Sequence, residues 1–216
     1  CIEHDAQFRR FTIPGRQRHI GRTCPIEGDW SGASFMLVAG AIAGDVAVSG
    51  LNRNSLQADR AILDALALAA VEVSWTAEDT CSVSKCKRLK AFQFDAENCP
   101  DLFPPLVALA ANAKGCSTIK GTSRLRHKES DRAESLRSEF AELGVAVELQ
   151  GDYMSIVGGA IGGGRIHSHQ DHRIAMACAI AALNAEDIVE ILNAECVSKS
   201  YPQFFDDLRK LGVNIA

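Results

Sequence analysis

The sequence is short of two features that mark membrane and nucleic-acid proteins: a long apolar run and a strong excess of one charge. None of its hydrophobic stretches reaches the roughly 18 apolar residues that a membrane-spanning helix needs. The net charge of its 216 residues is only −4, so the surface as a whole gives no reason to expect a nucleic acid or a membrane as a partner. Any basic site must be local. Hydrophobic residues make up 47% and charged residues 23%, which is typical of a globular protein that buries a sizeable core.

Paired cysteine motifs are also missing. The eight cysteines form no CxxC pair, and Cys81 and Cys86 have no histidine or second cysteine pair nearby that would complete a zinc site. Cys178 lies in the apolar run "IAMACAIAAL", where a thiol behaves as a small buried hydrophobic group. This usage predicts a reduced, cytoplasmic protein.

What the sequence does contain is an internal repeat of about 70 residues. Three aspartates, spaced by 72 and 70 residues, each precede an apolar helical segment: Asp29, Asp101 and Asp171. Three turns after strand-like runs are spaced by 71 and 72 residues: Gly50, Gly121 and Asn193. Because both sets keep the same period, chance similarity is a poor explanation.

Each unit is predicted to hold an Asp-capped apolar helix, a short strand, an amphipathic helix and one or two closing strands. An aspartate before a helix accepts hydrogen bonds from the free N–H groups of the first turn. The first helix of each unit is apolar nearly all round, so we expect it to be buried. The sequence therefore predicts an α/β fold of three βαβαββ-type units with buried helices inside and sheets outside. The closing strands are expected around Val73, Val147 and Ile215.

Residues 1–26 do not begin a repeat unit. They are interpreted as the closing strands of a preceding N-terminal domain and a crossover segment, so that residues 27–216 form the repeat domain. The chain is accordingly expected to be a fragment of a longer protein.

The stretch "RLRHKESDRAESL", residues 124–136, places four basic side chains at the start of a predicted helix: Arg124, Arg126, Lys128 and Arg132. A helix N-terminus already carries partial positive charge, and acidic residues usually occupy it. The stretch is either a solvated surface or a site for a multiply charged anion. The repeat favours the second alternative, because it brings Arg53, Lys128 and Lys199 to equivalent positions before the second helix of each unit.

Five motifs in order, spanning essentially the whole chain, resemble the 5-enolpyruvylshikimate-3-phosphate synthase family. They are "EGDWSGAS" (27–34), "RNSLQAD" (53–59), "HKESDR" (127–132), "QDHRIAMA" (170–177) and "CVSKSYPQFF" (196–205). The resemblance implies an enolpyruvyl transferase-like domain, the C-terminal one of two. It also implies transfer of the enolpyruvyl group of phosphoenolpyruvate to the 5-hydroxyl of shikimate 3-phosphate in the shikimate pathway. Phosphate is released, and no metal or organic cofactor is needed.

The resemblance also implies roles for particular residues. Arg132, Arg173 and Lys199 would clamp phosphoenolpyruvate, whose carboxylate and phosphate both suit arginine. Without the resemblance, Arg173 and Lys199 would be interpreted as surface charges.

The acid–base roles also come from the resemblance. Glu129 would lie near the methylene carbon, Asp101 near the attacking hydroxyl, and Lys128 near Asp101 and the shikimate ring. Without the resemblance, Glu129 would be a first-turn helix acid and Asp101 only a helix cap. His167 and His169 are interpreted as structural or rim residues.

Motifs of the family's first half are absent, and they hold most of the shikimate 3-phosphate. Since catalysis by positioning needs both halves, the isolated chain is expected to be inactive. Arg124 stands where some members have an asparagine, which leaves the contacts to shikimate 3-phosphate less determined. Two alternatives remain: an enzyme like UDP-N-acetylglucosamine enolpyruvyl transferase, or a non-catalytic anion-binding scaffold of the same fold.

Overall fold

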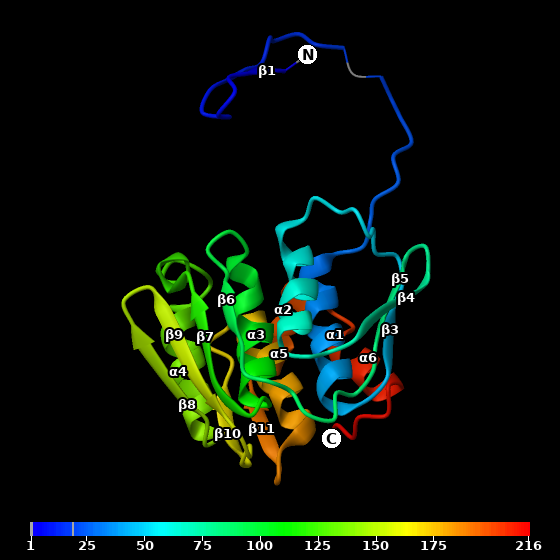
Figure 1. The fold of residues 1–216 in the computed structure, drawn as a ribbon. Coiled ribbons are helices and arrows are strands. Elements are labelled where there is room, and N and C mark those ends of the chain that lie inside the picture. The colour runs from blue at the N-terminus through cyan, green and yellow to red at the C-terminus, as the bar shows by residue number, and fades with distance from the viewer. Residues whose placement is uncertain (1, 19) are drawn as a thin grey trace.

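The computed structural model describes residues 2–18 and 20–216, which form a mixed α/β protein (Figure 1). The chain begins with an antiparallel pair of short strands, β1 (Glu3–His4) and β2 (Phe11–Thr12), in which Glu3 lies opposite Thr12. Figure 1 shows this pair and the segment after it standing away from the rest of the chain. The described residues before α1 are mostly exposed.

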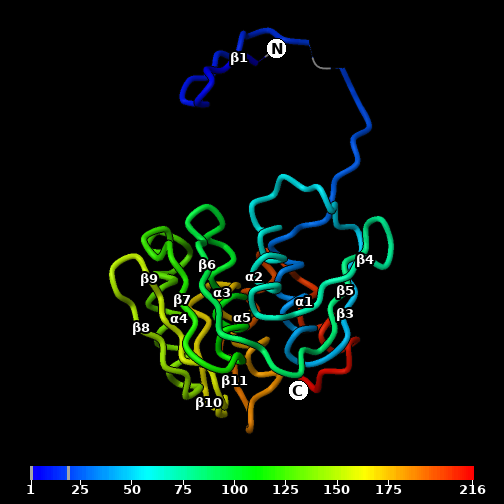
Figure 2. The backbone as a smooth tube through the Cα atoms, in the orientation of Figure 1, coloured from blue at the N-terminus to red at the C-terminus, as the bar shows by residue number. Residues whose placement is uncertain are grey.

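Three apolar helices form the centre of the structure and pack against one another (Figure 2). They are α1 (Trp30–Ala43), α3 (Phe103–Ala111) and α5 (His172–Ala181). Every residue of α3 is buried, because its sequence is apolar on all sides and other elements cover each face. Asp29 caps α1 by accepting hydrogen bonds from the backbone N–H groups of Ser31 (3.0 Å) and Gly32 (2.8 Å), and Asp171 caps α5 through the N–H of Arg173 (2.9 Å).

The strands form three further sheets. An antiparallel sheet has the order β3 (Val46–Val48), β5 (Thr80–Val83), β4 (Val73–Ala77). A larger sheet has the order β6 (Gln93–Asp95), β7 (Gly115–Lys120), β9 (Tyr153–Gly158), β8 (Ala146–Gln150), and only β6 and β7 are parallel. The third pairs β10 (Gly164–His167) with β11 (Val189–Leu192) in parallel. Alternate residues of β9, Met154 and Ile156, are buried, and this strand contacts α3.

The remaining helices lie outside the central three. They are α2 (Ile62–Leu68), α4 (Arg132–Glu142) and α6 (Phe204–Lys210). Short 3₁₀ helices connect the larger elements: η1 (Ala58–Ala61), η2 (Pro100–Leu102), η3 (Thr122–Arg124), η4 (Ala182–Asn184) and η5 (Ala194–Lys199). No helix in the described part of the chain combines the length and the apolar character that crossing a membrane requires.

Two local predictions are wrong. Asp101 does not cap α3: it lies in η2, and α3 begins after it with Pro104 and Pro105 in its first turn. Proline has no N–H to offer a capping carboxylate, so the Asp101 side chain is left to other partners. Ile215 does not lie in a strand, because no strand of the described chain pairs with residues 211–216; its side chain still packs against the core.

Candidate active site

The candidate site lies at the N-terminal ends of α3, α4 and α5. Asp101 comes from η2 just before α3, and Asp171 caps α5. Lys128 and Glu129 lie in the loop before α4, and Arg132 is the first residue of that helix. Positive dipole ends of helices and fixed cations therefore gather in one place.

Arg132 is the hub of this cluster. Its side chain has no exposed surface, and its Nε donates to Asp171 Oδ2 at 2.9 Å. Its Nη1 donates to Asp101 Oδ1 at 2.9 Å, and its Nη2 donates to Glu129 Oε2 at 2.5 Å. Burial alone would lower the pKa of this guanidinium, but Asp171, Glu129 and Asp101 together raise it. Arg132 is therefore a permanent buried cation that holds three carboxylates in place.

Asp101 in turn meets three cations. Lys128 Nζ lies 3.1 Å and Arg132 Nη1 2.9 Å from its Oδ1, and Arg173 Nη2 lies 3.3 Å from its Oδ2. Burial would raise the pKa of this carboxyl, but the charges of Arg173, Lys128 and Arg132 outweigh it and lower the pKa. Asp101 is ionised at neutral pH.

The cations differ in how open they are to a ligand. The side chain of Lys128 is 28% exposed and that of Arg173 is 11% exposed, whereas that of Arg132 is 0% exposed. The carboxylate side chain of Glu129 is 40% exposed. Lys128 and Glu129 thus form the open rim, Arg173 is mostly covered, and Arg132 is fully buried beneath them.

Lys199 joins the cluster only indirectly. It ends η5, and its Nζ donates to the backbone carbonyl oxygen of Gln170 at 2.7 Å, directly before Asp171. Arg53 lies elsewhere, with its guanidinium carbon 4.8 Å from the centroid of the Trp75 ring. Ion pairs thus connect Asp101, Lys128, Glu129, Arg132 and Arg173, whereas Lys199 contacts the residue before the helix cap.

Glu139 is a supporting residue that sequence reasoning missed. Its Oε2 accepts the backbone N–H of His167 at 2.7 Å, and its Oε1 lies 2.6 Å from Nε2 of His169. His169 and Gln170 have left-handed backbone angles, φ 53° and 58°, which non-glycine residues rarely adopt. Glu139 follows Arg132 by two turns of α4, so one helix face holds both the turn before Asp171 and Asp171 itself. The signal in the sequence was an acid beside the apolar face of α4.

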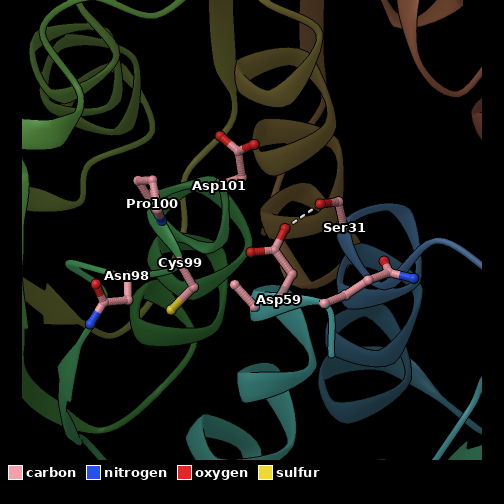
Figure 3. A pocket seen from close by; sticks show the side chains of 8 residues that line it. Ser31, Asp59, Asn98, Cys99, Pro100 and Asp101 are labelled. Carbon is pink, nitrogen blue, oxygen red and sulfur yellow. Dashed lines mark hydrogen bonds between the residues drawn. The ribbon is translucent and has the colours of Figure 1, made fainter. Parts of the chain in front are cut away.

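A cavity of about 300 Å³ opens beside Asp101 (Figure 3). Its lining residues are Ser31, Gln57, Ala58, Asp59, Asn98, Cys99, Pro100 and Asp101. Asp59 is only 8% exposed, and the Ser31 hydroxyl donates to its Oδ2. Burial raises the pKa of Asp59, although Ser31 and Arg173 partly offset this. The sequence placed Asp59 in a motif but gave it no role.

The start of α1 is held by neutral donors. Gln57 Nε2 donates to Glu27 Oε1 and to the carbonyl oxygen of Gly28, each at 3.0 Å, and Gln57 Oε1 accepts the backbone N–H of Trp30 at 3.0 Å. Ser55 adds a hydrogen bond of 2.7 Å to Glu27 Oε1. Hydrogen bonds from Ser55 and Gln57 lower the pKa of Glu27. Within the described residues, no group of three or more His, Cys, Asp or Glu side chains is arranged to hold a metal ion.

Comparison with known proteins gives consistent results. Residues 1–208 match the family model of EPSP synthase (3-phosphoshikimate 1-carboxyvinyltransferase). A 3-phosphoshikimate 1-carboxyvinyltransferase of Clostridium acetobutylicum is 41% identical over 215 residues, and one of Brachyspira hyodysenteriae is 37% identical over 215 residues. Each alignment covers 99% of this chain, but only 49% and 51% of the respective relative.

The fold agrees with that of a solved structure. An EPSP synthase of Acinetobacter baumannii matches with a TM-score of 0.83 at 25% sequence identity, covering 97% of this chain and 51% of the other. The chain thus spans about half the length of the curated relatives it matches.

Proposed function

This chain belongs to the EPSP synthase family, and we propose that it supplies the acid–base and anion-binding half of the active site of such an enzyme. The whole enzyme would transfer the enolpyruvyl group of phosphoenolpyruvate to the 5-hydroxyl of shikimate 3-phosphate and release phosphate. The observation that carries the proposal is the contact of Asp101 with Lys128, Arg132 and Arg173, since acid–base and anion-binding groups then share one site.

The finer architecture is part of the proposal. Residues 27–216 would be one enolpyruvyl transferase-like domain of three repeated units, each with one central helix among α1, α3 and α5 and one sheet outside it. Residues 1–26 would close a preceding domain and cross over to this one. The central packing of the three helices, and three separate sheets that are each built from one continuous stretch of the chain, support this division. A reducing, cytoplasmic location is supported by the free thiols of all described cysteines.

Phosphoenolpyruvate would bind through Arg132, Arg173 and Lys199. Its carboxylate would displace Glu129 from Nη2 of Arg132, because the two carboxylates present the same oxygen geometry to a guanidinium. Arg173 follows the Asp171 cap in α5, Lys199 contacts the carbonyl oxygen of Gln170 before it, and both would take the phosphate. Binding is thus an exchange of one carboxylate for another, and it releases Glu129 to move.

Asp101 and Glu129 would share the proton transfers. Asp101 accepts the proton of the 5-hydroxyl while that oxygen bonds to the central carbon of phosphoenolpyruvate, and Glu129 gives a proton to the methylene carbon. In the second step Glu129 takes a proton back from the new methyl group, the double bond forms again and phosphate leaves. Lys128 would hold Asp101 and the shikimate ring in register. Because the other half would hold most of the shikimate 3-phosphate, the isolated chain would be inactive.

The first test is calorimetric titration of the chain with phosphoenolpyruvate. Lys199→Ala and Arg173→Ala should each weaken binding about tenfold or more, since each removes a charge-assisted contact. Arg165→Ala is the matched control, because Arg165 is an exposed arginine paired with Glu190 on the β10–β11 sheet. Equal loss in the control would point to unspecific charge attraction and contradict the clamp.

Activity is tested in a rebuilt enzyme, in which this chain is joined to the part of the Clostridium acetobutylicum relative that it does not cover. We expect turnover with shikimate 3-phosphate and none with UDP-N-acetylglucosamine. Asp101→Asn and Glu129→Gln should each lower kcat by about 10²- to 10⁴-fold, the usual contribution of a positioned acid or base. Turnover of the UDP-sugar would favour the related transferase, and unchanged rates in both variants would favour a scaffold.

A further inference from the structure

We propose that Asp59 is the carboxyl group that finally holds the proton removed by Asp101 from the acceptor hydroxyl, and that the cavity between the two residues carries this proton. The inference deepens the proposed function and rests on it. Asp59 acts through Asp101 and does not touch the substrate.

The geometry places the two carboxyl groups in one cavity with unequal partners. Both line the same cavity of about 300 Å³, and Figure 3 shows the Asp59 carboxylate pointing toward Ser31, with Asp101 among the neighbouring lining side chains. Asp101 contacts three cations, whereas the described partner of the Asp59 side chain is a neutral hydroxyl, that of Ser31. Asp59 is also the more buried of the two, at 8% exposure.

The different surroundings of Asp101 and Asp59 determine which of the two carboxyl groups keeps the proton. A carboxylate held by three cations is a weak base, so Asp101 can take a hydroxyl proton only briefly unless a stronger base receives it. Burial raises the pKa of Asp59, and the charges of Asp101 and Asp29 raise it further, while Ser31 and Arg173 lower it. For Asp101, by contrast, the surrounding cations outweigh burial and lower the pKa. A proton on Asp101 therefore moves downhill to Asp59.

The cavity is suited to this transfer. Its polar lining includes Gln57 and Asn98 besides Ser31, and a water molecule occupies about 30 Å³, so several waters fit between the two carboxyl groups. The balance is simple: the hydroxyl loses one proton, Asp101 takes it and passes one to water, and the water chain gives one to Asp59. When the second step ends, Asp59 returns its proton to solvent and is ionised again.

A purely structural role is the competing explanation. Ser31 lies on α1 and Asp59 on η1, so their hydrogen bond could serve only to join these two elements. In that case Asp59 needs no particular pKa relative to Asp101. The order in which the two groups titrate separates the explanations.

The first experiment is a ¹³C NMR titration of the carboxyl groups in the chain itself, assigned with Asp59→Asn and Asp101→Asn. We expect Asp59 to titrate at higher pH than Asp101. Asp101→Asn should lower the Asp59 midpoint by removing a negative neighbour, and Ser31→Ala should raise it by removing a donor to the ionised form. An Asp59 that titrates at or below Asp101 overturns the proposal, whatever the enzyme does.

The second experiment measures kcat against pH in the rebuilt enzyme. Asp59→Asn keeps an acceptor for Ser31 but cannot take a proton, so kcat should fall about 100-fold, near the lower end for a proton-transfer group, with KM for phosphoenolpyruvate unchanged. Only an ionised Asp59 can receive the proton from Asp101. For this reason kcat should rise with pH through the Asp59 midpoint, and the variant should lose this rise. A variant that keeps the rise and changes KM or stability instead has lost a structural contact, and the relay is refuted. A wild-type rebuilt enzyme without turnover counts against the proposed function, and the titration then decides the relay alone.

Discussion

The starts of α1 and α3 hold their carboxylates in two different ways. Before α1, Glu27 is held by a hydroxyl and an amide, from Ser55 and Gln57. Before α3, Asp101 is held by the charges of Lys128, Arg132 and Arg173. Neutral hydrogen bonds fix the geometry of a carboxylate without bringing cations to it, whereas a cluster of ions can exchange one of its anions for a ligand. The same position in the fold thus holds a carboxylate by neutral hydrogen bonds in one place and by an ion cluster, the proposed anion site, in the other.

The largest effect should follow from removing the hub of the charged cluster. Arg132→Met leaves the fully buried Asp171 without its cationic partner, so the free energy of unfolding should fall by about 3–5 kcal/mol. Urea denaturation followed by circular dichroism measures this. Arg137→Met is the control, because Arg137 lies on the same helix in an exposed pair with Glu134 and should matter little. Equal midpoints for the two variants would show that the hub is not structural.

Glu139 supports the same cluster from two helical turns away. Glu139→Gln weakens the bonds to the N–H of His167 and to His169, so unfolding should cost about 1.5–3 kcal/mol less, as for hydrogen bonds to a charged group. Thermal denaturation measures the loss, and Glu142→Gln at the exposed end of the same helix is the control. Equal melting temperatures for the two variants would mean that the left-handed turn at His169 and Gln170 is stable without Glu139.

The sequence predicted the three central helices and two of their aspartate caps, but it assigned the wrong structural role to Asp101. The apolar segments predicted the three central helices, and Asp29 and Asp171 cap α1 and α5 as expected. The charged residues that meet at Asp101 lie in motifs, so the resemblance could select them. Asp101 was wrongly expected to cap α3, although Pro104 and Pro105 were visible in the sequence and remove two of the N–H donors of its first turn.

The supporting residues could not be found in the same way. Asp59 meets a serine 28 positions away, and Glu139 meets a histidine 30 positions away. No local period links such pairs, because they depend on how separate units pack. The sequence can show an acid beside an apolar helix face, as at Glu139, but it does not show which hydroxyl or backbone N–H the acid will meet.

A smaller effect is expected before α1, where the neutral side chains of Ser55 and Gln57 hold Glu27. Gln57→Ala leaves the N–H of Trp30 and the carbonyl oxygen of Gly28 without their partner and removes one of the two donors to Glu27 Oε1, so the free energy of unfolding should fall by about 1 kcal/mol. The loss should be the same at low and high salt, because no ion pair is broken. Urea denaturation at two salt concentrations measures it. A loss that shrinks as salt rises would mean that Glu27 is held mainly by charge, and the contrast with Asp101 would disappear.

The smallest effects, and the sharpest contrast, concern pH. Asp101 has a lowered pKa in the folded state, so its contribution to stability is present above the unfolded value of about 3.9 and is lost as pH falls through the folded pKa. Asp59 has a raised pKa, so its contribution is complete below about 3.9 and is lost as pH rises through the folded pKa. The two carboxyl groups at one cavity should therefore act in opposite directions.

Urea denaturation from pH 3 to 7 compares the wild-type chain with Asp101→Asn and Asp59→Asn. The stability deficit of Asp101→Asn should shrink as pH falls below about 4, since the wild type then loses the same ion pairs. The deficit of Asp59→Asn should shrink as pH rises above about 4, because the wild type must then ionise a buried carboxyl that the amide replaces without charge. Parallel curves for the two variants would mean that burial and cations act equally on both groups, and the proton would have no downhill path from Asp101 to Asp59. Opposite slopes would establish, from stability alone, the inequality on which that path depends.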